Sequence, residues 1–416
     1  MTRFKKDHAG AKPEITAGLL LGVMLLVSGS LCPLAVYGQQ PVGQTTAPQT
    51  VNPAAAGAPA IMPPNCRSAL LIEASTGETV YEMNADEPLP PASMVKMMTI
   101  LIAMEQIANG TLHLEDMITT SALASKIGGS QVYLKEHEQF SLEEMLKAVV
   151  IHSANDAATA IAERIGGSAE GFVHMMNERA AALGLTQTVF RTPHGLPPAA
   201  DQQPDLSTAR ELAVIGREVA IHHPKVLEWA QMNNVGFRNN EFIMANTNKL
   251  IGSYPGADGI KTGFYDKAGF CVTASALRNG VRMIAVVMGC EKGKQRFEEA
   301  ARLMSYGFDQ YKQITLIEKG VASSANLPVV DGEKTETTPV TAERLAVTIR
   351  KKDEASIVRK TMLFKNMTAP VSPNVECGSM TFQIGEKEIG RVPLITTEAI
   401  PALSWWGKFL RMIGLK

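Results

Sequence analysis

Two short runs near the start of the folded part of the chain, 69–73 and 78–82, have the apolar and β-prone composition of strands. The Ser75-Thr76-Gly77 segment between them is typical of a hairpin turn. From residue 93 the apolar positions follow a helical spacing, which predicts a helix over 93–108. We therefore expect a β-hairpin followed by a helix.

The middle of the chain is strongly helical in pattern. Ser141 and Glu144 form a capping box, in which each side chain caps a backbone donor at the start of a helix. That helix should break at 152–155 and resume toward residue 164, because polar residues interrupt the apolar face there. Three further helices are expected, over 169–183, 207–221 and 295–311.

Late β-type runs complete the pattern. The runs 270–277 and 281–290 flank Arg278-Asn279-Gly280, a tight hairpin turn. Helices placed between an early and a late hairpin indicate an α+β domain over 65–312, in which an antiparallel sheet packs with a helical cluster. From 313 to 397 short β-prone runs broken by Pro and Gly predict a small all-β domain.

The first 64 residues have no core-forming pattern. Basic residues precede an uncharged apolar stretch over 15–36, which predicts an export signal over 1–38. The same stretch is long enough to be an uncleaved membrane anchor, the alternative. Residues 39–64 are uncharged and rich in Gln, Pro, Ala and Thr, which is typical of a disordered linker. We therefore expect a periplasmic protein.

Charge and cysteine content narrow the function classes. The chain has 40 basic and 41 acidic residues, so nothing in its charge favours nucleic acid as a partner. Cys66, Cys271, Cys290 and Cys377 are widely and irregularly spaced, without the clustering of a zinc site. In an exported protein these cysteines are candidates for disulfides, but we assign no bridge and expect isolated buried thiols, no metal and no cofactor.

Ser93 and Lys96 form the first candidate catalytic element. Pro90 and Pro91 precede them and cannot lie inside a helix, which places Ser93 at the first turn of a new helix. Residues three apart then share a face, so the lysine can reach the serine hydroxyl. A lysine made neutral by its surroundings can take the proton of a serine nucleophile. Alone, the same spacing equally describes a helix cap with a surface lysine.

Two more elements are individually weak. Ser153-Ala154-Asn155 lies at the expected helix break, where a hydroxyl could relay a proton and an amide could hold a substrate carbonyl. Lys261-Thr262-Gly263 precedes the strand 270–277, where a cation and a hydroxyl could bind a carboxylate. Gly263 would let a substrate backbone approach closely. Each could also be an ordinary cap or turn.

Together the three elements, in this order, resemble the motif set of serine penicillin-recognising enzymes. Residues 66–312 are similar to the low-molecular-mass D-alanyl-D-alanine carboxypeptidases, and the similarity extends to a β-rich second domain and an amphipathic tail. The resemblance implies a penicillin-binding transpeptidase-like fold over 65–312. It also implies peptidoglycan stem peptides and β-lactam antibiotics as partners.

The resemblance implies a role for each motif residue. Ser93 would attack the carbonyl between two D-alanines and Lys96 would accept its proton, with Ser153 and Lys261 returning a proton to the leaving amine. Asn155 would position Lys96 and the substrate amide. The backbone N–H groups of Ser93 and Phe264 would hold the oxyanion, and Thr262 and Arg296 would bind the terminal carboxylate. Gly263 would allow the substrate to approach closely.

Three other readings stay open at this point. A DD-endopeptidase that cuts peptide crosslinks would carry the same motifs. A β-lactamase-like hydrolase would need a glutamate-bearing loop to activate water, and no convincing one is present. A non-catalytic wall-binding scaffold predicts decay of the motifs, yet all three are complete.

The last segment, 398–416, is amphipathic at helical spacing. One half of the helix carries Trp405, Trp406, Phe409, Leu410, Met412 and Ile413, and the other carries Ser404, Lys408 and Arg411. We expect an in-plane anchor on the inner-membrane surface, since the segment is too short to span a bilayer. The alternative is a helix docked by its apolar face on the β domain.

Overall fold

The structure, a computed structural model, describes residues 65–415. The export signal and the linker expected over 1–38 and 39–64 lie outside these residues.

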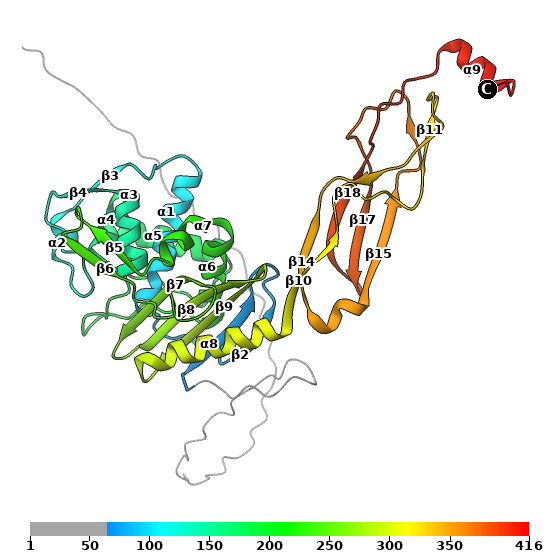
Figure 1. Cartoon of the computed structure of the whole chain (residues 1–416). Helices are drawn as coiled ribbons and strands as arrows, with labels where there is room; N and C mark the ends of the chain where they lie inside the picture. The colour runs from blue at the N-terminus through cyan, green and yellow to red at the C-terminus, as the bar shows by residue number, and fades with distance from the viewer. Residues whose placement is uncertain (1–64, 416) are drawn as a thin grey trace, which may run out of the picture. The chain divides into compact units, whose positions relative to one another are not determined.

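A five-stranded antiparallel sheet is the frame of the first domain (Figure 1). The strand order is β2-β1-β9-β8-β7, so the early hairpin pairs with the late one through β1 and β9. The strands are β1 (Ser68–Glu73), β2 (Thr79–Met83), β7 (Ala257–Tyr265), β8 (Gly269–Arg278) and β9 (Val281–Cys290). The α+β class and both hairpins expected from the sequence are thereby confirmed.

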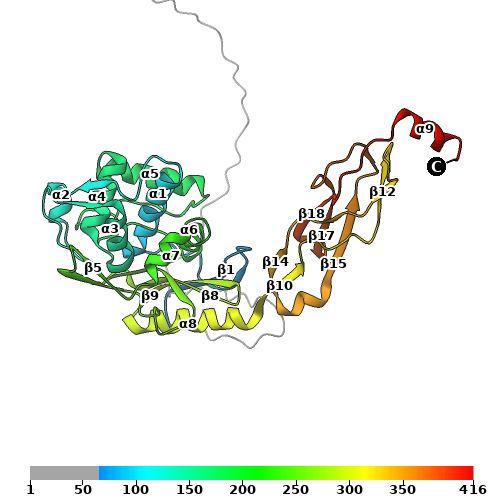
Figure 2. The ribbon, with the colours of Figure 1, turned by 45° about the horizontal axis from the view of Figure 1, so that its top comes forward.

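Helices cover both faces of this sheet (Figure 2). The long helix α8 (Gly293–Gln310) crosses one face, and a single apolar layer fills the space between them. The opposite face carries the helical cluster and the larger core. Its helices are α1 (Lys96–Ala108), α2 (Ala122–Lys126), α3 (Leu142–Lys147), α4 (Asn155–Gly166), α5 (Ala169–Ala182), α6 (Ala209–His222) and α7 (Pro224–Ala230).

Local side-chain caps explain several helix starts. Ser141 accepts from the backbone N–H of Glu144 and completes the expected capping box at α3. Ser168 and Thr208 cap α5 and α6 in the same way. Two short antiparallel strand pairs that the sequence pattern missed lie beside the cluster: β3 (Met117–Thr119) with β4 (Gln139–Ser141), and β5 (Asn234–Phe237) with β6 (Phe242–Ala245).

The start of the first long helix differs in detail from the prediction. The turn Ala92–Val95 is a 3-10 helix, and α1 begins only at Lys96. Ala92 has φ 49°, a left-handed conformation that is unusual for a residue with a side chain. The nucleophile candidate therefore lies in a tight turn ahead of the helix.

One cysteine expectation was wrong. Cys66, just before β1, is bonded to Cys290, the last residue of β9. The two strands pair in register, which brings cysteines 224 positions apart to neighbouring strand ends. Sequence spacing cannot show this, because only the β1–β9 pairing makes them neighbours. Cys271 and Cys377 are buried free thiols, as expected.

The segment after α8 is a small β domain with its own apolar core. Its main sheet has the order β13-β18-β17-β15, and a second pair joins β10 to β14. The larger strands are β10 (Tyr311–Ile317), β14 (Leu345–Arg350), β15 (Ile357–Leu363), β17 (Glu376–Ile384) and β18 (Lys387–Ile395). Short strands complete it: β11 (Leu327–Val330), β12 (Glu336–Thr337), β13 (Val340–Thr341) and β16 (Met367–Thr368).

The chain closes with a short helix, α9 (Trp405–Met412), capped by Ser404. Within residues 65–415, no helix combines the length and the apolar character that a membrane crossing requires.

Candidate active site

Ser93 lies where two backbone segments press against its turn. A side-chain carbon at Gly263 of β7 would lie 2.5 Å from the carbonyl oxygen of Pro91 and 3.2 Å from the Ser93 nitrogen. One at Gly195 would lie 2.1 Å from the Ala92 oxygen. Only glycine allows such approaches. The turn is therefore clamped between β7 and the loop that contains Gly195.

Lys96 is fully buried one turn after Ser93. Its Nζ donates to Ser93 Oγ at 3.0 Å and to the His194 carbonyl at 2.6 Å. Burial lowers the pKa of Lys96 well below its usual value, and the nearby Lys261 lowers it further. A neutral amine in hydrogen-bonding distance of a hydroxyl is a competent general base.

A second lysine and serine face the same site. Lys261 Nζ donates to Ser153 Oγ at 2.8 Å, and only 1 % of Lys261 is exposed. Burial, and then the charge of Arg296, lower the pKa of Lys261 to about 7. Ser153 follows a π-helical turn, Ala148–His152, and has φ 64°, which aims its hydroxyl at β7 rather than along α4.

Asn155 begins α4 and is held by the segment that contains Gly128 and Ser130. Its Nδ2 donates to the Gly128 carbonyl at 2.7 Å, and its N–H donates to the Ser130 carbonyl. Its Oδ1 is buried and has no hydrogen-bond partner among residues 65–415. A buried unpaired amide oxygen is costly, so this atom is ready to accept a hydrogen bond from a ligand. The contact between Asn155 and Lys96 implied by the resemblance is not among its hydrogen bonds.

The remaining candidates lie on β7 or contact it. Thr262 Oγ1 donates to Thr247 Oγ1 at 2.8 Å. Phe264 is half exposed, and its ring stacks on Phe270 with centroids 4.0 Å apart. Arg296, from the first turn of α8, donates from Nη1 to the carbonyls of Gly263 and Cys271. Its guanidinium therefore binds the strand that carries Lys261.

Sequence reasoning missed the main-chain partner of Lys96. That partner is the carbonyl of His194, in the loop 192–196. Burial and the neighbouring Lys96 lower the pKa of His194 to about 3, so its imidazole is neutral. Its Nδ1 accepts from the Leu196 N–H. No sequence signal marks a carbonyl as a ligand.

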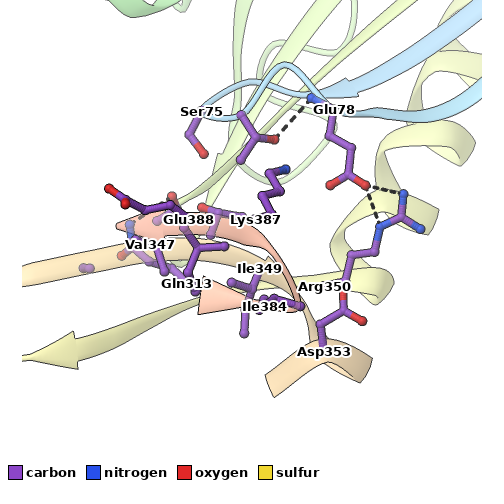
Figure 3. A pocket seen from close by; sticks show the side chains of 15 residues that line it. Ser75, Glu78, Gln313, Val347, Ile349, Arg350, Asp353, Ile384, Lys387 and Glu388 are labelled. Atoms are coloured by element: carbon purple, nitrogen blue, oxygen red, sulfur yellow. Dashed lines mark hydrogen bonds and ion pairs between the residues drawn. The ribbon is translucent and has the colours of Figure 1, made fainter. Parts of the chain in front are cut away.

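One hollow of the described surface adjoins this cluster, and another lies away from it. A hollow of about 590 Å³ is lined by His194, Leu196 and neighbouring residues of the same loop. The other, of about 540 Å³, has Glu78, Gln313 and Lys387 in its lining and none of the motif residues (Figure 3). There Arg350 donates to the Glu78 carboxylate at 2.8 Å, so the two charges neutralise each other. Residues 65–415 contain no cluster of metal-ligating side chains.

Comparison with known proteins agrees with this geometry. Residues 54–292 match the family model described as D-alanyl-D-alanine carboxypeptidase, and residues 311–402 match the C-terminal domain of penicillin-binding protein 5. The D-alanyl-D-alanine carboxypeptidase DacF of Bacillus subtilis is 34% identical over 336 residues, which cover 80% of this chain and 85% of DacF.

Solved structures give the same picture. Penicillin-binding protein 5 from Haemophilus influenzae has a TM-score of 0.63 at 27% identity, covering 83% of this chain and 100% of that one. Penicillin-binding protein D2 from Listeria monocytogenes, solved in an ampicillin-bound form, has a TM-score of 0.55 at 30% identity, covering 60% and 100%.

The sheet, the helical cluster and a lysine-paired serine define a serine hydrolase of the penicillin-binding class. The chain belongs to the peptidase S11 family of D-alanyl-D-alanine carboxypeptidases. It is a serine-type D-Ala-D-Ala carboxypeptidase.

The clamp on the nucleophile turn gives a prediction with a matched control. Gly195 and Gly184 both have φ 74°, but a side-chain carbon at Gly184 meets nothing within 4 Å. Gly184→Ala should cost about 1 kcal/mol of backbone strain and leave penicillin acylation unchanged. Gly195→Ala must also displace the Ser93 turn, so acylation should slow by about 100-fold. Stopped-flow acylation by a labelled penicillin measures both. Equal acylation rates in the two variants would contradict the clamp.

Proposed function

We propose that Ser93 is the nucleophile with which this carboxypeptidase removes the terminal D-alanine of peptidoglycan stem pentapeptides. The observation that carries the proposal is the 3.0 Å contact between Lys96 Nζ and Ser93 Oγ, made by a lysine that is fully buried. Burial disfavours the ammonium form, so Lys96 can be the proton acceptor that a serine needs.

Acylation then proceeds by transfer of one proton and exchange of one bond. Ser93 Oγ attacks the carbonyl carbon between the two D-alanines while its proton passes to Lys96. The oxyanion is held by the backbone N–H groups of Ser93 and Phe264, which lie on the nucleophile turn and on β7. The carbon–nitrogen bond breaks as the amine takes a proton delivered through Ser153 and Lys261. D-alanine leaves, and an ester remains on Ser93.

Deacylation reverses the proton flow. Water attacks the ester carbonyl and gives its proton to Lys96. The bond between the carbonyl carbon and the Ser93 oxygen then breaks, and Lys96 returns its proton to that oxygen. The shortened peptide leaves with a new terminal carboxyl group, which restores the free enzyme. The pKa of Lys261, near 7, suits a group that both gives and takes a proton in these steps.

Four further residues form the substrate site. The unpaired Oδ1 of Asn155 accepts the N–H of the stem peptide. Thr262 binds the terminal carboxylate once its hydroxyl proton turns from Thr247 to the substrate. Arg296 supports that subsite in two ways, because it holds the Gly263 carbonyl and adds a positive charge beside Thr262. Gly263 allows the peptide to lie along β7.

The first test combines labelling with product analysis. Ser93→Ala should abolish covalent labelling by a fluorescent penicillin without changing the melting temperature, because only one hydroxyl is removed. Wild-type protein should release D-alanine from a pentapeptide that ends in D-Ala-D-Ala. An adduct mapped by peptide mass to another residue would overturn the nucleophile assignment. Faster cleavage of a crosslinked dimer than of the pentapeptide would instead favour the DD-endopeptidase reading.

The tail supports a second proposal, that the exported protein is periplasmic and rests on the inner-membrane surface through α9. The basic side of α9 faces the β domain: Lys408 pairs with Asp331, and Arg411 donates to the carbonyls of Gly332 and Glu333. The aromatic side is turned away, with 77 % of Trp405 and 43 % of Phe409 exposed. A helix docked by its apolar face, the alternative expected from the sequence, would show the reverse.

The orientation of α9 fits an interfacial anchor. Exposed tryptophans and aliphatic residues on one side of a short helix partition to the headgroup boundary of a bilayer. In one respect the structure changes the expectation, because Lys408 and Arg411 contact the protein instead of lying free for anionic headgroups. Apolar burial, not charge, then has to supply most of the membrane affinity.

The tail is best tested with a chain that ends at Leu403. Ile400 is buried and pairs with Val371, so a cut before it would damage the β domain. The protein ending at Leu403 should remain in the supernatant of a vesicle sedimentation assay and keep its acylation rate, while the full chain pellets. Met362→Asp, at an exposed apolar residue of β15, is the control and should pellet like wild type. Sedimentation of the shortened chain with vesicles would refute the anchor.

A further inference from the structure

Asp205 is a buried carboxylate beside the catalytic cluster that no motif includes. It lies ahead of α6, and only 4 % of it is exposed. Its Oδ1 accepts the backbone N–H groups of Arg191 and Thr192 at 2.6 and 3.0 Å, and its Oδ2 accepts the Thr192 hydroxyl at 2.9 Å. All three partners are donors, which matches an ionised carboxylate.

Those contacts continue to Lys96 through one tight loop. The Thr192 hydroxyl, which donates to Asp205, accepts the Gly195 N–H at 2.8 Å. The same peptide unit joins Gly195 to His194, whose carbonyl accepts Lys96 Nζ at 2.6 Å. From α1, Thr99 donates to the Pro193 carbonyl at 2.7 Å and holds the other side of the loop. Asp205 is thus linked to Lys96 by consecutive hydrogen bonds and one rigid peptide group.

The charged groups that act on Lys96 lie on several elements of the fold. Lys261 on β7 lowers the pKa of Lys96, whereas Asp205, and after it Asp156 on α4, raise that pKa. His194 is neutral, because burial and Lys96 itself lower its pKa to about 3. Burial raises the pKa of Asp205, and the hydrogen bonds from residues 191 and 192 oppose that rise.

We propose that Asp205 is a positioning residue: through Thr192 it fixes the His194 carbonyl that orients the Lys96 amine toward Ser93, and its charge is the main counterweight to Lys261. The proposal rests on the role of Lys96 as base that is proposed above. It adds a residue that touches neither substrate nor nucleophile and acts on the reaction only through the lysine.

The test is the pH profile of acylation by a labelled penicillin, measured on the full chain. Asp205→Asn keeps the size and two acceptor contacts but removes the charge. The acidic limb of the acylation rate should move to lower pH by roughly 0.5 to 1 unit, because Lys96 loses a neighbouring anion. The plateau rate should fall about tenfold, because the carbonyl is held less firmly. Asp201→Asn removes the same charge from an exposed position of the same loop and should leave both unchanged.

Variants of Thr192 separate the effect of the Asp205 charge from the effect of the hydrogen bonds. They also keep the proposal testable if the Asp205 variant misfolds. Thr192→Val keeps the carboxylate but breaks the hydrogen-bonded path, so the plateau should fall while the acidic limb stays near the wild-type position. Thr192→Ser restores the hydroxyl and should restore the rate. An unmoved acidic limb in folded Asp205→Asn, or a wild-type plateau in Thr192→Val, would overturn the proposal. Wild-type protein that is not acylated at Ser93 would instead defeat the proposed nucleophile.

Discussion

The desolvation of two lysine amines is the constraint on which the site depends. Lys96 and Lys261 are almost completely removed from water, although burying an ammonium group costs several kcal/mol unless it is neutralised or well paired. Each amine is given oxygen acceptors and no carboxylate: Ser93 and the His194 carbonyl for Lys96, Ser153 and the Thr262 carbonyl for Lys261. Burial lowers the pKa values of both lysines, and within residues 65–415 neither amine has an ion-pair partner.

The fold supplies this dry site by clamping three segments together. The helical cluster brings Ser153, the sheet brings Lys261, and the Ser93 turn lies between them. At Gly195 and Gly263 the backbone packs closely against the nucleophile turn. Arg296 of α8 then ties the far end of β7 to the opposite face of the sheet. The helical cluster and α8, on opposite faces of the sheet, therefore both contribute to the surroundings of Lys261.

The sequence was informative where chemistry needs particular side chains at short spacing. The Ser93 to Lys96 spacing, the capping box at Ser141 and the hairpin turn at Asn279 all correspond to structure that a local pattern can specify. Long-range contacts were not predictable in the same way. The Cys66 to Cys290 bond depends on the pairing of two distant strands. The basic side of α9 contacts residues 331–333 of the β domain, and the Lys96 amine contacts the carbonyl of His194. Each is fixed by tertiary structure rather than by local pattern.

The proposed reactivity of Ser93 depends on the lowered pKa of Lys96. That pKa can be measured directly by following the ¹³Cε resonance of Lys96 with pH in protein labelled at lysine, with the signal assigned by its loss in Lys96→Arg. The account predicts a titration midpoint well below the ordinary lysine value of 10.5. A midpoint at that ordinary value would contradict it, since a protonated Lys96 could not accept the proton of Ser93.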